Sequence, residues 1–143
     1  QRLRLKTLAV LPHVRRKNRE QLARLVVDDK FSQFSEAVAG LRNLLDSPRY
    51  QEMSKVLLCM STQPGEGKTI TSCSLAASCA QSGQRTLLID FDMRRPRLAR
   101  IFEKKAAEFH SLPHTLAKND PSLFASLPIP SGIENLDVVL SKA

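Results

Sequence analysis

The stretch from residue 62 to residue 70 carries glycine, lysine and threonine in an order that suits phosphate binding. Glycines at Gly65 and Gly67 let the backbone curl, so that several N–H groups can point at one anion. The ammonium of Lys68 can reach the β- and γ-phosphates of a nucleotide, and the hydroxyl of Thr69 can bind Mg²⁺. We therefore predict a nucleotide-binding loop whose members are Thr62, Gln63, Pro64, Gly65, Glu66, Gly67, Lys68, Thr69 and Ile70.

The residues on either side predict the elements that hold this loop. The apolar run Val56–Met60 has the length and composition of a buried parallel strand. The segment Ile70–Ser82 is rich in small residues and predicts a helix that Gly83 can end. The strict loop pattern requires a glycine where this chain has Thr62, so an ordinary strand–turn–helix with a chance Gly-Lys-Thr is the alternative.

Two acids follow a second predicted strand, Thr86–Ile89. Asp90 and Asp92 are separated by one residue, so their side chains share a face if the chain stays extended. Doubly wound sheets bind their ligands at the carboxyl ends of their strands, and both acids could face a metal–phosphate site there. The alternative is a pair of solvated acids in a turn that leads into a helix at Pro96.

The two motifs together resemble a known family. PGEGKT at residues 64–69 and LLIDFDMRRP at residues 87–96 are similar to the Walker A and Walker A′ motifs of the bacterial tyrosine kinases. These are the kinase domains of regulators of capsule and exopolysaccharide chain length. The resemblance runs from about Phe31 to the end of the chain. It implies an α/β fold, a P-loop NTPase-like three-layer sandwich with a mostly parallel sheet.

The resemblance also implies a reaction, the transfer of a phosphoryl group from Mg·ATP to tyrosine hydroxyls. It gives Lys68, Asp90 and Asp92 catalytic roles, with Asp90 as the acceptor of the tyrosine proton. Thr69 and Asp92 would hold Mg²⁺, and Arg94 would help to position phosphate. The implied partners are ATP, tyrosines of neighbouring protomers and the machinery that exports polysaccharide.

Some features depart from the family or leave alternatives open. Gln63 stands where partitioning ATPases carry a signature lysine, which argues against an ATPase switch of that type. An inactive regulator of polysaccharide polymerisation is a further alternative.

A helix motif for self-association is matched by Glu36 and Arg42 but interrupted by Ala39, so a homo-oligomer is possible but the motif is incomplete. The family's Walker B strand and tyrosine-rich tail have no counterpart here. We therefore expect a C-terminally incomplete, inactive piece with exposed apolar edges.

The net charge of +8 is concentrated at one end of the chain. Residues 1–30 hold nine Lys and Arg against three acids. The resemblance implies that this surplus belongs to a basic juxtamembrane-like arm before a kinase domain at residues 31–143, and an ordinary solvated basic surface is the alternative. Such an arm would favour an anionic membrane surface, at the cytoplasmic face of the bacterial inner membrane in the complete protein. With no Trp and one Tyr, the chain offers little for base stacking, and no nucleic-acid partner is expected. The piece itself is expected to be soluble and cytoplasmic.

The other elements are predicted from periodicity and breakers. A helix at Ser32–Leu45 has an apolar stripe formed by Phe31, Phe34, Val38, Leu41 and Leu45. The remaining predictions are a strand at 8–11, a helix at 18–27 with Asn18 as its cap, a helix at 96–102, a helix at 114–117, a loop at 121–132 and a strand at 135–140.

Overall fold

The computed structural model describes residues 6–14, 19–51, 56–105 and 108–142. Its helices are α1 (Arg19–Asp28), α2 (Gln33–Leu45), α3 (Pro48–Gln51), α4 (Lys68–Gln81), α5 (Leu98–Ile101), α6 (Leu112–Lys118) and α7 (Pro121–Phe124). Its strands are β1 (Thr86–Ile89), β2 (Ile129–Ile133) and β3 (Leu136–Val139). The cap predicted at Asn18 lies outside the described residues. Within the described parts of the chain, no helix is both long enough and apolar enough to cross a bilayer.

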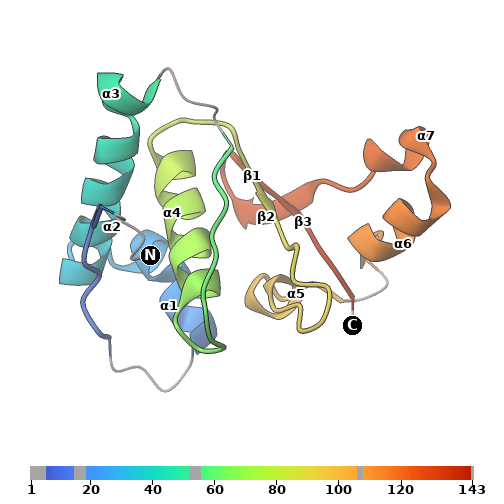
Figure 1. The fold of residues 1–143 in the computed structure, drawn as a ribbon, viewed down its shortest axis with the longest axis horizontal. Coiled ribbons are helices and arrows are strands. Elements are labelled where there is room, and N and C mark those ends of the chain that lie inside the picture. Colours follow the sequence, from blue (N-terminus) through green and yellow to red (C-terminus); the bar gives the residue numbers. More distant parts are fainter. Residues whose placement is uncertain (1–5, 15–18, 52–55, 106–107, 143) are drawn as a thin grey trace, which may run out of the picture.

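The sheet is built around β3, which lies between the other two strands (Figure 1). β1 and β3 are parallel and in register from Thr86 opposite Leu136 to Ile89 opposite Val139. β2 and β3 are antiparallel, with an irregularity between Pro130 and Ile133. The strands predicted at 86–89 and 135–140 are therefore confirmed, while the short strand predicted at 8–11 is absent from this described segment.

The loop predicted at 121–132 is wrong, because this segment forms α7 and β2. Pro130 is tolerated in β2 because β2 is an outer strand, where a residue without an N–H group breaks no central ladder. Asn135, with φ 63°, lies in the turn between β2 and β3, so the two strands form a hairpin. Counting prolines as breakers therefore missed an edge strand.

The two faces of β3 bury different groups of residues, so that helices lie on both sides of the sheet. Leu136 and Val138 belong to the main core, which also contains the buried residues of α4 and α5. The next residue, Val139, packs instead with Leu112 of α6 and with Leu127. Because alternate residues of a strand point to opposite faces, β3 holds two apolar layers together.

Helix α4 lies against the sheet through small side chains, as its composition predicts. Its buried residues include Cys73, Ala76, Ala77 and Ala80, which permit a close approach. Burial raises the pKa of the Cys73 thiol to about 12, so this cysteine is a protonated core residue. Gly83, with φ 88°, donates to the carbonyl of Ala80 at 3.0 Å and ends the helix as expected.

The helices before the loop pack on α4 and on each other. Leu25 and Val26 of α1 form a cluster with Phe34 and Val38 of α2. α1 therefore packs against α2, and the division predicted at residue 30 stays a prediction. Ser32 caps α2 as expected, by accepting from the N–H of Ser35 at 3.2 Å. The apolar stripe fails at its first member, because the side chain of Phe31 is exposed.

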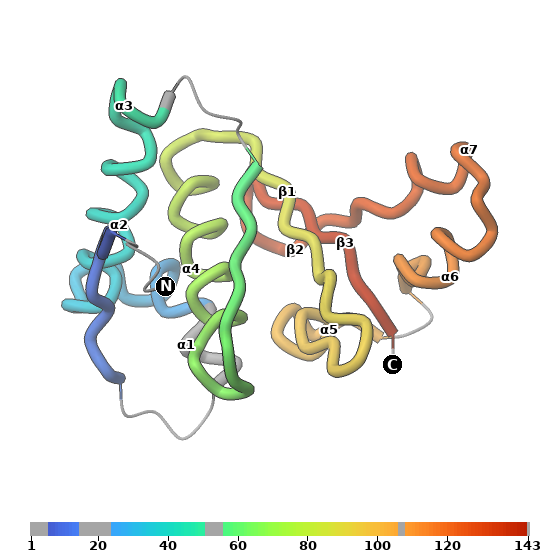
Figure 2. The backbone as a smooth tube through the Cα atoms, viewed as in Figure 1, coloured from blue at the N-terminus to red at the C-terminus, as the bar shows by residue number. Residues whose placement is uncertain are grey.

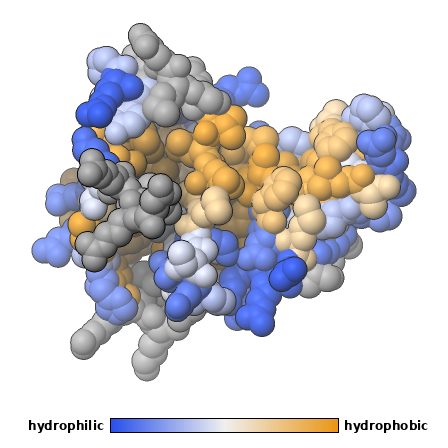
Figure 3. All heavy atoms as spheres, in the orientation of Figure 1, coloured by the Kyte–Doolittle hydropathy of each residue, from blue (hydrophilic) through white to orange (hydrophobic). Residues whose placement is uncertain are grey.

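The segment Val56–Met60 was predicted to be a buried strand, and this prediction is wrong. The segment is extended and leads into the loop before α4 (Figure 2), but it is not one of the strands of the described sheet. Val56 is 81% exposed and Leu58 is 78% exposed. Exposed apolar side chains of this segment and of β1 gather at the centre of one face of the molecule (Figure 3). The expectation of exposed apolar edges is confirmed.

We predict that Leu140→Ala lowers the free energy of unfolding by about 2–5 kcal/mol, because it leaves a cavity where a side chain is 0% exposed. Urea unfolding measures this change. Asp137→Asn, on exposed β3 surface, is the matched control and should change stability by less than about 0.5 kcal/mol. Equal effects of the two substitutions would contradict the placement of the core.

Candidate nucleotide site

The predicted loop curls into the N-terminus of α4. Gly65 and Gly67 have φ values of 92° and 93°, in the left-handed region that favours glycine. Gly67 is the N-cap residue of α4, so Lys68 and Thr69 form the first turn of the helix. The unpaired N–H groups and positive partial charge of a helix N-terminus favour an anion at this point. The loop thus has the backbone form that phosphate binding requires.

One ion pair joins this loop to the second motif. The Lys68 ammonium donates to Oδ2 of Asp92 at 2.9 Å, although the two residues lie 24 positions apart in the chain. The N–H of Arg95 donates to the other oxygen of the same carboxylate at 3.0 Å. The hydrogen bond from Lys68 is the largest cause that lowers the pKa of Asp92 below its ordinary value. The structure therefore brings together the lysine and one of the two predicted acids.

Asp90 occupies a different environment from Asp92. It is 7% exposed, and its carboxylate accepts from the N–H groups of Asp92 at 3.1 Å, Arg97 at 3.0 Å and Leu98 at 3.1 Å. Its own carbonyl accepts from the hydroxyl of Ser141 at 2.8 Å, which ties the end of β1 to the residues after β3. Asp90 thus holds the turn that presents Asp92. Asp92 thus contacts Lys68, while the carboxylate of Asp90 accepts from backbone N–H groups.

Glu66 makes contacts that the sequence analysis did not foresee. Its carboxylate accepts from the N–H groups of Thr62 at 2.9 Å and Gln63 at 3.1 Å, and also from the hydroxyl of Thr62. The hydrogen bond from Gln63 is the largest cause that lowers the pKa of Glu66.

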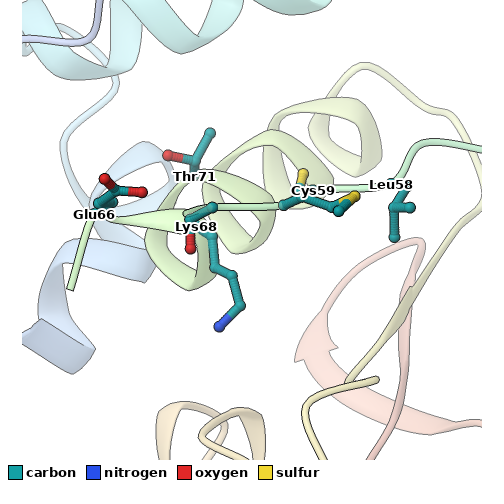
Figure 4. A pocket seen from close by; sticks show the side chains of 7 residues that line it. Leu58, Cys59, Glu66, Lys68 and Thr71 are labelled. Carbon is teal, nitrogen blue, oxygen red and sulfur yellow. The ribbon is translucent and has the colours of Figure 1, made fainter. Parts of the chain in front are cut away.

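A pocket of about 360 Å³ opens beside the loop (Figure 4). It is lined by Leu58, Cys59, Met60, Ser61, Glu66, Lys68 and Thr71. Leu58 and Met60 supply apolar wall, and Lys68 supplies positive charge. Cys59 and Thr71 were not among the predicted site residues, and neither carries a motif that would have marked it.

The remaining predicted residues differ in how they could contribute. Thr69 is half-buried in the first turn of α4, where its hydroxyl could join Asp92 in holding a metal ion. Ile70 packs its side chain against the α1–α2 cluster, which leaves its backbone N–H as the group available to a phosphate. Gln63, Pro64 and Arg94 are exposed. A carboxylate and a hydroxyl beside a phosphate loop fit Mg²⁺, which usually shares its coordination with nucleotide phosphates and water.

Arg42, which matched the self-association motif, contacts its own chain. Its guanidinium donates to the carbonyl of Ser78 in α4 at 3.2 Å and to the side chain of Asn43 at 2.8 Å. Glu36 remains exposed on α2. This arginine therefore helps to dock α2 on α4.

Comparison with known proteins agrees with this geometry. Residues 57–137 match the family described as the CobQ/CobB/MinD/ParA nucleotide binding domain. The chain is 39% identical over 82 residues to the succinoglycan biosynthesis transport protein ExoP of Rhizobium meliloti (strain 1021). The matched region covers 57% of this chain and 10% of ExoP. It is 32% identical over 119 residues to the tyrosine-protein kinase Etk of Escherichia coli (strain K12). The matched region covers 83% of this chain and 16% of Etk.

The solved kinase domain of Escherichia coli tyrosine kinase ETK has the same fold, with a TM-score of 0.76 and 28% sequence identity. The match covers 94% of this chain and 55% of that chain, so the present sequence spans about half of the solved domain. The predicted α/β P-loop fold is confirmed.

We predict that Lys68→Met returns the pKa of the Asp92 carboxyl toward its ordinary value, because the largest cause of its lowering is removed. Carbon-detected NMR titration of the carboxyl groups measures this change. Since the folded-state pKa is lowered, the ion pair persists at neutral pH and is lost as the pH falls through that lowered value. Asp120, whose pKa is lowered by Ser122, is an internal control that should not change. An unchanged Asp92 would contradict the ion pair.

We predict that Asp90→Asn destabilises the domain by about 1–3 kcal/mol, because the amide group cannot accept all the N–H donors that now face the carboxylate. Asp92→Asn, at a more exposed position, should cost less. Thermal unfolding compares the two variants. A larger loss for Asp92→Asn would contradict the assignment of Asp90 to the turn.

Proposed function

The chain belongs to the CobQ/CobB/MinD/ParA nucleotide-binding domain family, and from this premise we propose that it forms the ATP-binding part of a protein-tyrosine kinase. The observation that carries this proposal is the 2.9 Å contact between Lys68 and Asp92. It gathers the phosphate loop and the second acidic motif at one point. The similarity to a protein named tyrosine-protein kinase, over 83% of this chain, supports phosphoryl transfer to tyrosine as the reaction.

Each residue of the loop then has a definable role. The N–H groups from Gly65 to Ile70 surround the phosphates of ATP, and Lys68 leaves Asp92 to follow charge on the γ-phosphoryl group. Thr69 and Asp92 would hold Mg²⁺, which would supply positive charge to the phosphates. Arg94 lies two residues after Asp92 and is exposed, and its side chain contacts the phosphates from the edge of the site.

In the proposed reaction a tyrosine hydroxyl attacks the γ-phosphorus, the bond to the β-phosphate oxygen breaks, and ADP leaves. The hydroxyl proton must also depart. The resemblance assigned its acceptance to Asp90, whose carboxylate accepts from three backbone N–H groups. Because a carboxylate has about four acceptor positions, one remains for the tyrosine proton. We propose that Asp90 accepts this proton and also holds the turn that positions Asp92. Positioning and charge neutralisation then supply most of the catalysis.

We further propose that the full protein acts in the synthesis and export of exopolysaccharide. The similarity to ExoP, whose name places it in succinoglycan biosynthesis transport, supports this role. Tyrosines of neighbouring protomers would be the acceptors, and the export machinery would be the partner. The surplus of basic residues in positions 1–30 favours the cytoplasmic face of an inner membrane with anionic lipids.

An ATPase switch of the partitioning type is the second candidate, because the matched family includes ParA and MinD. Gln63 is exposed at the position where those ATPases carry a signature lysine. The uncharged amide of Gln63 cannot pair with the phosphates of a second protomer as the ammonium of a lysine does. This substitution favours the kinase over the switch.

We predict that Lys68→Ala weakens ATP binding by roughly a hundredfold and abolishes tyrosine phosphorylation in the full-length protein, because the charged donor to the phosphates is lost. Calorimetry and phosphotyrosine mass spectrometry measure the two effects. Lys105→Ala, at an exposed position away from the loop, is the matched control and should change neither. ATP hydrolysis without phosphotyrosine in the unsubstituted protein would favour the switch, and ATP binding without either activity would favour an inactive regulator.

A further inference from the structure

The carboxylate of Glu66 closes a small ring within the loop. It reaches back four residues to the N–H and hydroxyl of Thr62 and three residues to the N–H of Gln63. These contacts join the start of the loop, where the extended segment ends, to its middle. We call this set of contacts between Glu66 and residues 62–63 the loop clasp.

Thr62 is the residue that breaks the strict glycine pattern, and the loop clasp gives it a use. Among the described residues other than glycine, positive φ occurs at Glu103, Asn119 and Asn135 and not at Thr62. The backbone at this position therefore accepts a Cβ atom without strain. The hydroxyl that comes with the side chain lies 3.1 Å from Oε1 and 3.2 Å from Oε2 of Glu66. A glycine at this position could not make either hydrogen bond.

We propose that Glu66 is a positioning residue of the nucleotide site, which holds the loop in its binding form with the Thr62 hydroxyl as its partner. This inference rests on the proposed function, because it concerns the binding of ATP to the same loop. A loop that is already ordered loses less conformational entropy when its ligand binds, and its affinity is correspondingly higher.

The direction in which the Glu66 carboxylate points distinguishes a positioning role from direct competition with the phosphates. The partners of Glu66 lie at residues 62 and 63, before the helix N-terminus formed by Gly67 and Lys68. Figure 4 shows the Glu66 carboxylate and the Lys68 ammonium projecting to different sides of the loop. A free carboxylate beside a triphosphate would repel it, whereas a carboxylate whose charge is offset by N–H donors repels it less.

The clasp is present under physiological conditions. Hydrogen bonds from Gln63 and Thr62 lower the pKa of Glu66, so the side chain is charged and accepts hydrogen bonds at neutral pH. Because the folded-state pKa lies below the ordinary value, the contacts are lost only as the pH falls through that lowered value. The amide signals of Thr62 and Gln63 should therefore shift together in acid.

The test measures ATP affinity by calorimetry in the full-length protein. We expect Glu66→Ala to weaken binding roughly tenfold, because the loop must then be ordered when ATP binds. Thr62→Val should weaken binding in part, and Thr62→Ser, which keeps the hydroxyl, should bind normally. The double variant should be no weaker than Glu66→Ala, since both changes remove one interaction. Glu134→Ala, an exposed acid outside the loop, is the matched control.

A structural role alone would lower the melting temperature together with the affinity. We expect Glu66→Ala to leave the melting temperature of the unliganded protein unchanged, because the side chain is exposed. Unchanged or tighter ATP binding by Glu66→Ala would overturn the proposal, and tighter binding would identify the carboxylate as a competitor of phosphate. Failure of the unsubstituted protein to bind ATP would overturn the proposed function and this inference with it. The amide titration of Thr62 and Gln63 would still report whether the clasp forms.

Discussion

The ion pair between Lys68 and Asp92 is the contact on which the rest of the site depends. The lysine begins α4 and the aspartate follows β1, so their 2.9 Å approach joins the start of the helix to the residues after the strand. Each charge satisfies the other. A nucleotide that replaces Asp92 as the partner of Lys68 must place more negative charge beside the ammonium than one carboxylate does. The phosphate groups carry that charge.

The turn after β1 is built to keep Asp92 in that place. Asp90 is buried and its carboxylate gathers the N–H groups of Asp92, Arg97 and Leu98, while β3 pairs with β1 along its whole length. Two aspartates separated by one residue thus make different contacts, because Asp90 accepts from backbone N–H groups and Asp92 pairs with Lys68. In the loop, Glu66 and Lys68 both line the pocket, and Glu66 also accepts from backbone N–H groups.

The exposed segment Val56–Met60 shows how the same apolar residues can predict a strand and yet not form one. Its composition is that of a buried strand, but burial requires a neighbour on each side of the chain. Within the described residues, β3 is the strand that pairs with β1, and this segment is not a strand of that sheet. Its exposed side chains join those of Leu87 and Ile89 in one apolar surface. The match covers 55% of the solved ETK kinase domain.

The sequence by itself determined the local features: the glycines of the loop, the helix that follows, the end of that helix at Gly83, and strands β1 and β3. These depend on backbone preferences and on apolar periodicity, which residues express through near neighbours. Only the tertiary structure decided which of two adjacent acids meets Lys68, that Glu66 clasps Thr62, that α1 packs into the domain, and that Pro130 lies in an edge strand. The physical reason is that these outcomes depend on hydrogen-bond partners and burial from distant parts of the chain. Spacing along the sequence does not encode them.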